Sequence, residues 1–553
     1  MDAMQRLVDL NAVARLRARD SSLFGDDAES LELAASRLGW TDLAERASTL
    51  LTELERLAVD AAEDGVTDVV LLGMGGSSLA ALVLAETLGQ GSDRRLHVLD
   101  TTDPHTVGAA LADLDPAKTL YVVSSKSGGT IEPNSLYAVF REVADIALGA
   151  EQAGSRFIAI TDPGSSLEGL AGSAGFRTLV SAPPAVGGRF SALSAFGLAP
   201  AALAGIDVDE LVERAAAMEA AMSVPAAENP AAILAAFIDD ALRAGKDKLT
   251  IVASEPLRSF GLWAEQLVAE SLGKEGMGVV PVVELSDDFP QGYGPDRAIV
   301  AVRLEDDQRL AEWLERLGHH APLLELTLRD LYDIGAEWVR WEHAIALVGA
   351  LMSVNPFGQP DVASAKAATS AALDGTLEVP AAETVCPDGV CLTFAGALGA
   401  PTHAERSAAT ALGHAIASMR ESDYLAVLAY LPYRPDVLAP LEAAVPPVSA
   451  ILGSAITLEL GPRYLHSTGQ LHKGGPDNAV FIVVTTRDAA DVPVPGRPWG
   501  LRTLFRAQAE GDLATLASAG RRVLRIDLPD SSAESVALVA HALESAAGVV
   551  WES

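Results

Sequence analysis

Two short segments rich in glycine and hydroxyl residues are the first places where this chain of 553 residues could do chemistry. Gly-Met-Gly-Gly-Ser-Ser occupies 73–78, and Ser-Ser-Lys-Ser-Gly-Gly-Thr occupies 124–130. Each follows a short apolar β-branched run and precedes a helical pattern. Glycine lets the backbone approach a ligand closely, and the N–H groups that open a helix attract an anion. The two segments together predict a site that holds a phosphate group on a small molecule.

The first segment alone leaves two other interpretations open. It resembles a dinucleotide-binding turn, with Asp100 at the end of the next strand as the ribose partner, although Ser78 stands where a small Gly or Ala should pack. It also fits a simple strand–helix turn capped by Ser77. The second segment favours the phosphate interpretation, because hydroxyls, N–H groups and helix dipoles together suit the three oxygens of a terminal phosphomonoester.

The elements that must position these segments alternate between strand and helix. Short buried strands separated by helices predict parallel sheets covered on both faces. We therefore expect an α/β fold with two doubly wound parallel-sheet domains in tandem and a C-terminal α/β region. The expected divisions are N-terminal helices over 1–62, a first domain over 63–205, a second over 206–378 and the C-terminal region over 379–553. Strands are expected at 68–72, 96–100, 120–124, 157–161, 249–253, 278–284, 298–304, 323–328, 424–430, 455–460, 480–485 and 523–527, and helices include 79–88, 135–148, 260–272, 338–352 and 533–546.

Composition excludes several classes of function. The formal net charge of −35 disfavours a nucleic-acid partner. Every apolar run is interrupted too early to span a membrane, and the N-terminus lacks the pattern of a signal peptide, so we expect a cytoplasmic protein. Cys386 and Cys391 are expected to be two thiols beside a Pro-Asp-Gly turn, with a disulfide as the alternative and no zinc site.

Further residues could supply acid–base chemistry. Glu270 and Gln266 are one turn apart on an expected helix and project from the same face. Apolar neighbours of Glu270 argue against a solvated position. Arg189 follows two glycines in a loop, where a cation can approach a ligand closely.

The motifs at 73–79, 125–133, 187–191 and 266–274, taken in this order, resemble the glucose-6-phosphate isomerase family. The closest likeness is to the isomerase half of bifunctional transaldolase/glucose-6-phosphate isomerases, over about residues 60–480. No part of the chain is left for a transaldolase barrel, which needs about 250 residues. The resemblance implies two sugar-isomerase (SIS) domains, no metal, no cofactor, a homodimer, and reversible isomerisation of glucose 6-phosphate and fructose 6-phosphate through a cis-enediol.

The resemblance also implies a role for each matched residue. Glu270 would be the proton-transfer base, and Arg189 would stabilise the enediolate. The segments at 355–366 and 465–470 resemble the catalytic-lysine and ring-opening histidine segments, which makes Lys366 and His466 catalytic. The substrate phosphate would be held by Ser77, Ser125, Lys126, Ser127 and Thr130, and the sugar by Gly76, Gly188 and Gln266.

One feature departs from the family pattern, because Lys366 precedes His466 here whereas the histidine usually comes first. We expect a rearranged C-terminal region that preserves the site, with His472 and Lys473 as the competing candidates. Three alternative functions stay open: a phosphomannose or bifunctional phosphoglucose/phosphomannose isomerase, a non-catalytic sugar-phosphate sensor, and a nicotinamide dehydrogenase.

Overall fold

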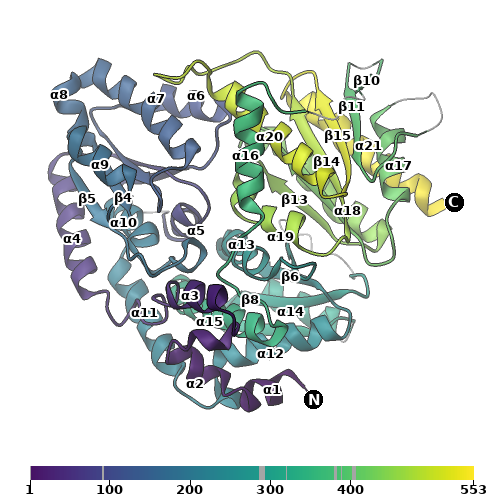
Figure 1. Cartoon of the computed structure of the whole chain (residues 1–553), viewed down its shortest axis with the longest axis horizontal. Coiled ribbons are helices and arrows are strands. Elements are labelled where there is room, and N and C mark those ends of the chain that lie inside the picture. The colour runs from purple at the N-terminus through teal and green to yellow at the C-terminus, as the bar shows by residue number, and fades with distance from the viewer. Residues whose placement is uncertain are drawn as a thin grey trace.

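The computed structural model describes residues 2–89, 93–284, 293–318, 320–378, 383–387, 389–401 and 407–552. Within these residues the strands form three sheets, each flanked by helices, as Figure 1 shows. The N-terminal segment is helical, as expected. Its helices are α1 (Ala3–Asp9), α2 (Ala12–Arg17), α3 (Ala28–Ala35) and α4 (Ser48–Glu63).

The first sheet is parallel throughout, with strand order β2-β1-β3-β4-β5. Alternate residues of β1 enter two separate cores: Val69 and Leu71 pack with α5 and α10, and Val70 and Leu72 pack with α7 and α9. This two-sided burial is the physical reason for the continuous apolar strands. The elements are β1 (Asp68–Leu72), α5 (Leu79–Leu88), β2 (Arg95–Leu99), α6 (Pro104–Asp113), β3 (Thr119–Ser124), α7 (Ile131–Leu148), α8 (Ala150–Ala153), β4 (Phe157–Thr161), α9 (Ser166–Ser173), β5 (Thr178–Ser181) and α10 (Ala195–Ala204).

The second sheet is also parallel, with strand order β7-β6-β8-β9. Its helix α13 carries Gln266 and Glu270, and all but one of the residues of this helix are buried. The elements are α11 (Val208–Ala221), α12 (Pro230–Arg243), β6 (Lys248–Ala253), α13 (Phe260–Leu272), β7 (Val280–Val283), β8 (Arg297–Leu304), α14 (Gln308–Leu317), β9 (Leu323–Leu328) and α15 (Ile334–Met352).

The third sheet is mixed, with strand order β10-β11-β15-β14-β12-β13. Four strands are parallel, and the hairpin of β10 and β11 adds an antiparallel edge. The elements are α16 (Val362–Leu373), β10 (Glu383–Val385), β11 (Cys391–Gly396), α17 (Ala408–Ala417), β12 (Tyr424–Ala429), α18 (Pro435–Leu452), β13 (Ile456–Leu460), α19 (Gly469–Gly474), β14 (Ala479–Thr486), α20 (Leu501–Ser518), β15 (Arg522–Leu528) and α21 (Ala533–Glu552).

The hairpin places Cys386 and Cys391 close in sequence but not in a bond. Both are buried and neither is in a disulfide, and the N–H of Cys386 donates to the carbonyl of Val390. The expectation of two thiols is confirmed and the disulfide alternative is wrong, while Asp388 of the expected turn lies outside the described residues.

Several predicted bounds differ from the structure. Helix α7 begins at Ile131, four residues earlier than expected, because Pro133 is tolerated in the first turn of a helix. Helix α16 packs along α20, where a Cβ on Gly511 would lie 2.8 Å from the backbone nitrogen of Thr369. We therefore propose that the third unit begins with α16 rather than at residue 379; part of the expected boundary, 379–382 and 388, lies outside the described residues. Among the described helices, none combines the length and hydropathy that a membrane crossing needs.

Candidate active site

A cavity of about 370 Å³ lies where the three units meet, at the carboxyl ends of β1 and β3. Of the residues to which the family resemblance assigns a role, all but Ser125 line this cavity. Residues far apart in the chain therefore meet at one place. The nominated lining residues are Gly76, Ser77, Lys126, Ser127, Thr130, Gly188, Arg189, Gln266, Glu270, Lys366 and His466.

Glycines in the first loop permit a close approach between backbones. A Cβ on Gly76 would lie 2.2 Å from the carbonyl of Gly188, which leaves no room for any side chain. Gly75 has φ +54°, in the left-handed region that favours glycine, and a Cβ there would lie 2.9 Å from Nε2 of Gln266. The glycines thus bring the loop against both the Arg189 loop and α13.

The second loop is tied to the first by hydrogen bonds. The hydroxyl of Ser124 donates to the carbonyl of Ser77 over 2.9 Å. The buried Ser125 hydroxyl donates to Oγ1 of Thr130 over 3.1 Å, so Ser125 holds Thr130 in place and does not line the cavity. Because α7 starts directly after Thr130, the N–H groups of its first turn, which have no partner within the helix, lie at the loop.

Lys126 does not offer an isolated positive charge. Its ammonium lies 2.5 Å from Oδ2 of Asp162 and donates to the carbonyl of Pro184. Burial lowers the pKa of Lys126, and Asp162 opposes that shift. A bound anion would therefore share this cation with Asp162.

Glu270 and Arg189 form a buried ion pair. Oε1 of Glu270 lies 3.2 Å from Nη1 of Arg189, and both side chains are less than a tenth exposed. Nε of Arg189 donates to the Ser271 hydroxyl over 2.9 Å, and Nη2 donates to the carbonyl of Pro356 over 2.5 Å. Burial lowers the pKa of Arg189, and Glu270 opposes the shift. The guanidinium is thus fixed beside the carboxylate at the cavity wall.

Gln266 presents an available acceptor. Its Nε2 donates to the carbonyl of His466 over 2.6 Å. Its Oε1 is buried and has no hydrogen-bond partner among the described residues. Because a buried acceptor without a partner is costly, this oxygen is suited to a ligand hydroxyl.

His466 is paired with a residue that the sequence analysis did not nominate. Its Nε2 lies 3.0 Å from Oε1 of Glu132, in the first turn of α7. Burial acts to raise the pKa of Glu132, but the charge and hydrogen bond of His466, a backbone hydrogen bond and the charge of Lys366 together lower it. The signal available in the sequence was a carboxylate placed directly after the second loop.

The competing candidates lie elsewhere. His472 is buried beside Glu459, 3.4 Å away, and Lys473 lies 2.5 Å from Asp512. Neither lines the cavity. Lys366, on the exposed face of α16, does line it together with His466, so the reversed chain order still brings both to one cavity.

Asp100 is not available to a ribose. Its carboxylate is fully buried and accepts two hydrogen bonds from Arg463, over 2.6 and 2.9 Å. The dinucleotide interpretation of the first loop therefore lacks the carboxylate that would bind the ribose. No cluster of His, Cys, Asp or Glu suited to a metal ion occurs in the described part of the chain.

The fold and the cavity define a doubly wound α/β protein with two glycine- and hydroxyl-rich loops at the carboxyl ends of parallel strands, where such folds bind their ligands. The family model described as phosphoglucose isomerase matches residues 55–280, which include both loops, Arg189, Gln266 and Glu270. Lys366 and His466 lie beyond that match.

Individual relatives agree with the family match. Glucose-6-phosphate isomerase of Rubrobacter xylanophilus is 32% identical, over 65% of this chain and 91% of that protein. That of a Cyanothece species is 32% identical, over 61% and 72% of the two chains. The crystal structure of a glucose-6-phosphate isomerase from Chlamydia trachomatis has a TM-score of 0.58 at 19% identity, covering 68% of this chain and 86% of that one. The chain belongs to the phosphoglucose isomerase family, and the predictions of family and fold class are confirmed.

Proposed function

We propose that this protein interconverts glucose 6-phosphate and fructose 6-phosphate through a cis-enediol. One observation carries the proposal: a buried carboxylate, Glu270, lies 3.2 Å from a fixed guanidinium, Arg189, on the same cavity as two anion-binding loops. An aldose–ketose isomerase needs these three features together, since it must anchor the substrate, move one proton and stabilise an oxyanion.

The loops supply the anchor for the phosphate. Hydroxyls of Ser77, Ser127 and Thr130 line the cavity, and the N–H groups that open α7 lie beside them. Lys126 adds a cation that Asp162 partly balances. Donors of this kind can satisfy the phosphate oxygens without a dense cluster of positive charge.

Ring opening is assigned to His466, with Lys366 near it. A cyclic sugar phosphate opens when its anomeric hydroxyl loses a proton, the bond between the anomeric carbon and the ring oxygen breaks, and the ring oxygen takes up a proton. The pairing of Glu132 with Nε2 favours a proton on that nitrogen and leaves Nδ1 to exchange a proton with the sugar.

Proton transfer is assigned to Glu270. From the open aldose it takes the C2 proton, whose C–H electron pair forms the C1–C2 double bond while the carbonyl oxygen gains a proton. Arg189 stabilises the negative charge that develops on oxygen. The proton then returns from Glu270 to C1, and the O2 hydroxyl loses its proton to form the C2 carbonyl of the ketose, which balances the proton gained by O1. Gln266 Oε1 accepts a hydrogen bond from a sugar hydroxyl.

Two alternatives remain for the same cavity. A sugar-phosphate sensor would need the loops but not the buried Glu270–Arg189 pair, so the pair favours the enzyme. A phosphomannose isomerase would use the same groups with different stereochemistry at C2.

A coupled assay tests the proposal directly. We expect glucose 6-phosphate to form from fructose 6-phosphate in the presence of a chelator, with mannose 6-phosphate as a parallel substrate. Absence of turnover with both sugars would leave a binding protein, and turnover of mannose 6-phosphate alone would reassign the substrate.

We further propose that the protein acts as a homodimer and that its substrate is a cytoplasmic metabolite. The support for both is membership of the family. Sedimentation of the full chain at micromolar concentration tests the dimer.

A further inference from the structure

A chain of hydrogen bonds joins the third unit to His466. Gln508 on α20 donates from Nε2 to Oε1 of Glu132 over 2.7 Å. The hydroxyl of Thr102, just after β2, donates to Oε1 of Gln508 over 2.6 Å. The same Glu132 oxygen lies 3.0 Å from Nε2 of His466. The first and third units of the fold therefore meet at one carboxylate oxygen.

The orientation of the Gln508 amide follows from chemistry. An ionised carboxylate only accepts hydrogen bonds, so the NH₂ end of Gln508 must face Glu132. Its oxygen then faces Thr102, whose hydroxyl can donate. Both residues are at most 1% exposed. Because buried polar groups are costly without hydrogen-bond partners, only this orientation of the Gln508 amide satisfies both Glu132 and Thr102.

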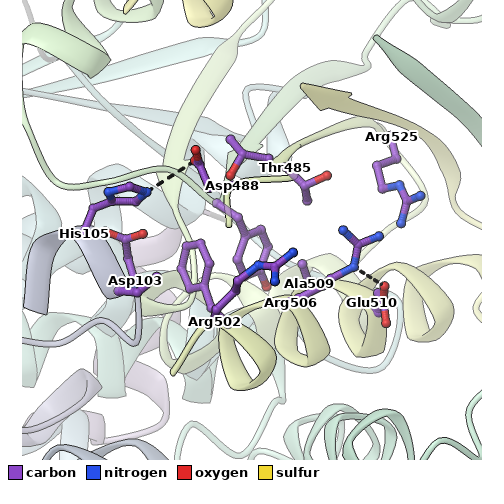
Figure 2. Close-up of a pocket in the computed structure, with 13 residues that line it drawn as sticks. Asp103, His105, Thr485, Asp488, Arg502, Arg506, Ala509, Glu510 and Arg525 are labelled. Atoms are coloured by element: carbon purple, nitrogen blue, oxygen red, sulfur yellow. Dashed lines mark hydrogen bonds and ion pairs between the residues drawn. The ribbon is translucent and has the colours of Figure 1, made fainter. Parts of the chain in front are cut away.

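Helix α20 is held firmly enough to position a neighbour. One turn after Gln508, Asp512 accepts from the Tyr464 hydroxyl over 2.7 Å and pairs with Lys473, so the same face of α20 also holds the segment that carries His466. The adjacent face of α20 lines a narrow cavity opposite Asp103 and His105, which follow Thr102 in the chain (Figure 2). Gln508 is therefore flanked by the Tyr464–Lys473 segment, which Asp512 holds, and by the cavity that Asp103 and His105 line.

We propose that Gln508 is a positioning residue for the ring-opening step: held by Thr102, it aims Oε1 of Glu132 at Nε2 of His466. The proposal rests on the proposed function. Without Gln508 the carboxylate can rotate or take up another partner, such as the nearby Lys366, and His466 loses its fixed orientation and proton position. The proton transfer by Glu270 does not involve this chain of hydrogen bonds.

The test separates ring opening from proton transfer with two substrates. Fructose 6-phosphate must be opened first, whereas 5-deoxy-fructose 6-phosphate has no hydroxyl at C5 with which to close its ring. We expect Gln508→Leu to lower kcat for fructose 6-phosphate about tenfold, as for loss of a hydrogen bond to a charged group. KM should stay within about twofold, and turnover of the 5-deoxy substrate, followed by NMR, should be unchanged.

Further variants distinguish a loss of positioning from a folding defect. Thr102→Val should reproduce the selective loss, Thr102→Ser should retain activity, and Thr503→Ala on the exposed face of α20 is the matched control. Equal losses with both substrates, or no loss with fructose 6-phosphate, would overturn the proposal. A wild-type protein that isomerises neither substrate would instead overturn the proposed function.

Discussion

The two loops of the first unit and the 463–473 segment of the third unit both contribute to one cavity but are held in place by different means. The loops depend on backbone geometry, since Gly75 and Gly76 allow contacts that no other residue permits. The 463–473 segment depends on buried side chains that reach distant elements. Arg463 pairs with Asp100, Thr468 bonds Glu459, and Lys473 pairs with Asp512.

This difference predicts that the two regions affect different kinetic constants. A loop built from N–H groups and hydroxyls should set how tightly the phosphate is held. A segment positioned by ion pairs should set how often His466 is in place for chemistry. Substitutions in the first region should therefore change KM, and substitutions in the second should change kcat.

The largest effect is expected at Glu270, which lines the cavity to which both regions contribute. Glu270→Gln keeps the size of the side chain but removes the base, so kcat should fall about 10³-fold. KM should change little, because the loops are untouched. Steady-state kinetics with circular dichroism as a check on folding measures this, and near-normal turnover would refute the assignment.

The next effect is expected where the 463–473 segment meets the first unit. Asp100→Asn leaves the buried Arg463 guanidinium without its anionic partner, which should lower the free energy of unfolding by about 3 kcal/mol. It should also lower kcat at constant KM, because His466 is three residues away. Denaturant unfolding and kinetics test both, with Asp60→Asn in the exposed Arg56–Asp60 pair as a control expected to be nearly neutral. A rise in KM alone would contradict the expectation that the 463–473 segment affects kcat rather than KM.

A smaller and opposite pattern is expected in the first loop. Ser77→Ala removes one hydroxyl from the cavity wall without disturbing the glycines, so KM should rise about tenfold while kcat stays within a few-fold. The exposed Ser223→Ala is the matched control. An unchanged KM would show that the Ser77 hydroxyl does not bind the phosphate.

The smallest effect is expected at Lys274, which is hydrogen-bonded to the 355–358 segment. Its ammonium donates to the carbonyls of Asn355 and Gly358, over 2.9 and 2.5 Å. Burial, with a contribution from Arg189, lowers the pKa of Lys274 to about 6. In the unfolded chain the pKa returns to about 10.4, so the unfolded state binds more protons between these two values.

The contribution of Lys274 to stability therefore rises with pH across that window and is lowest below the folded pKa. The difference in free energy of unfolding between the wild type and Lys274→Met should increase by about 1 kcal/mol between pH 6 and pH 7. Urea denaturation at the two pH values measures it. A difference that stays constant with pH would contradict the lowered pKa.

Much of the fold followed from short-range patterns. Strands β1 and β4 and helices α5 and α13 have the predicted bounds, because apolar runs between turn residues and helical periodicity are local properties. The long helix α20 was not predicted, since Gln508 and Asp512 are buried polar residues that interrupt its apolar pattern. The antiparallel edge of the third sheet was also missed, because pairing direction is set by strands distant in sequence.

Glu132 marks the limit of the site prediction. The local sequence shows only a carboxylate one residue into a helix, a position that usually serves the helix dipole. Its partners His466 and Gln508 lie more than 300 residues further along the chain. Nothing near Glu132 indicates that it is buried or which side chains it meets.

The sequence by itself determined the two glycine- and hydroxyl-rich loops between strand and helix and the Glu270–Gln266 helix, because glycine, hydroxyls, helix starts and helical spacing act over a few residues. Only the tertiary structure decided that Lys366 and His466 share a cavity in spite of their reversed order, and that Asp100 holds Arg463 rather than a ligand. The physical reason is that ion pairs and buried hydrogen bonds select partners by position in the folded core, where distance along the chain has no bearing.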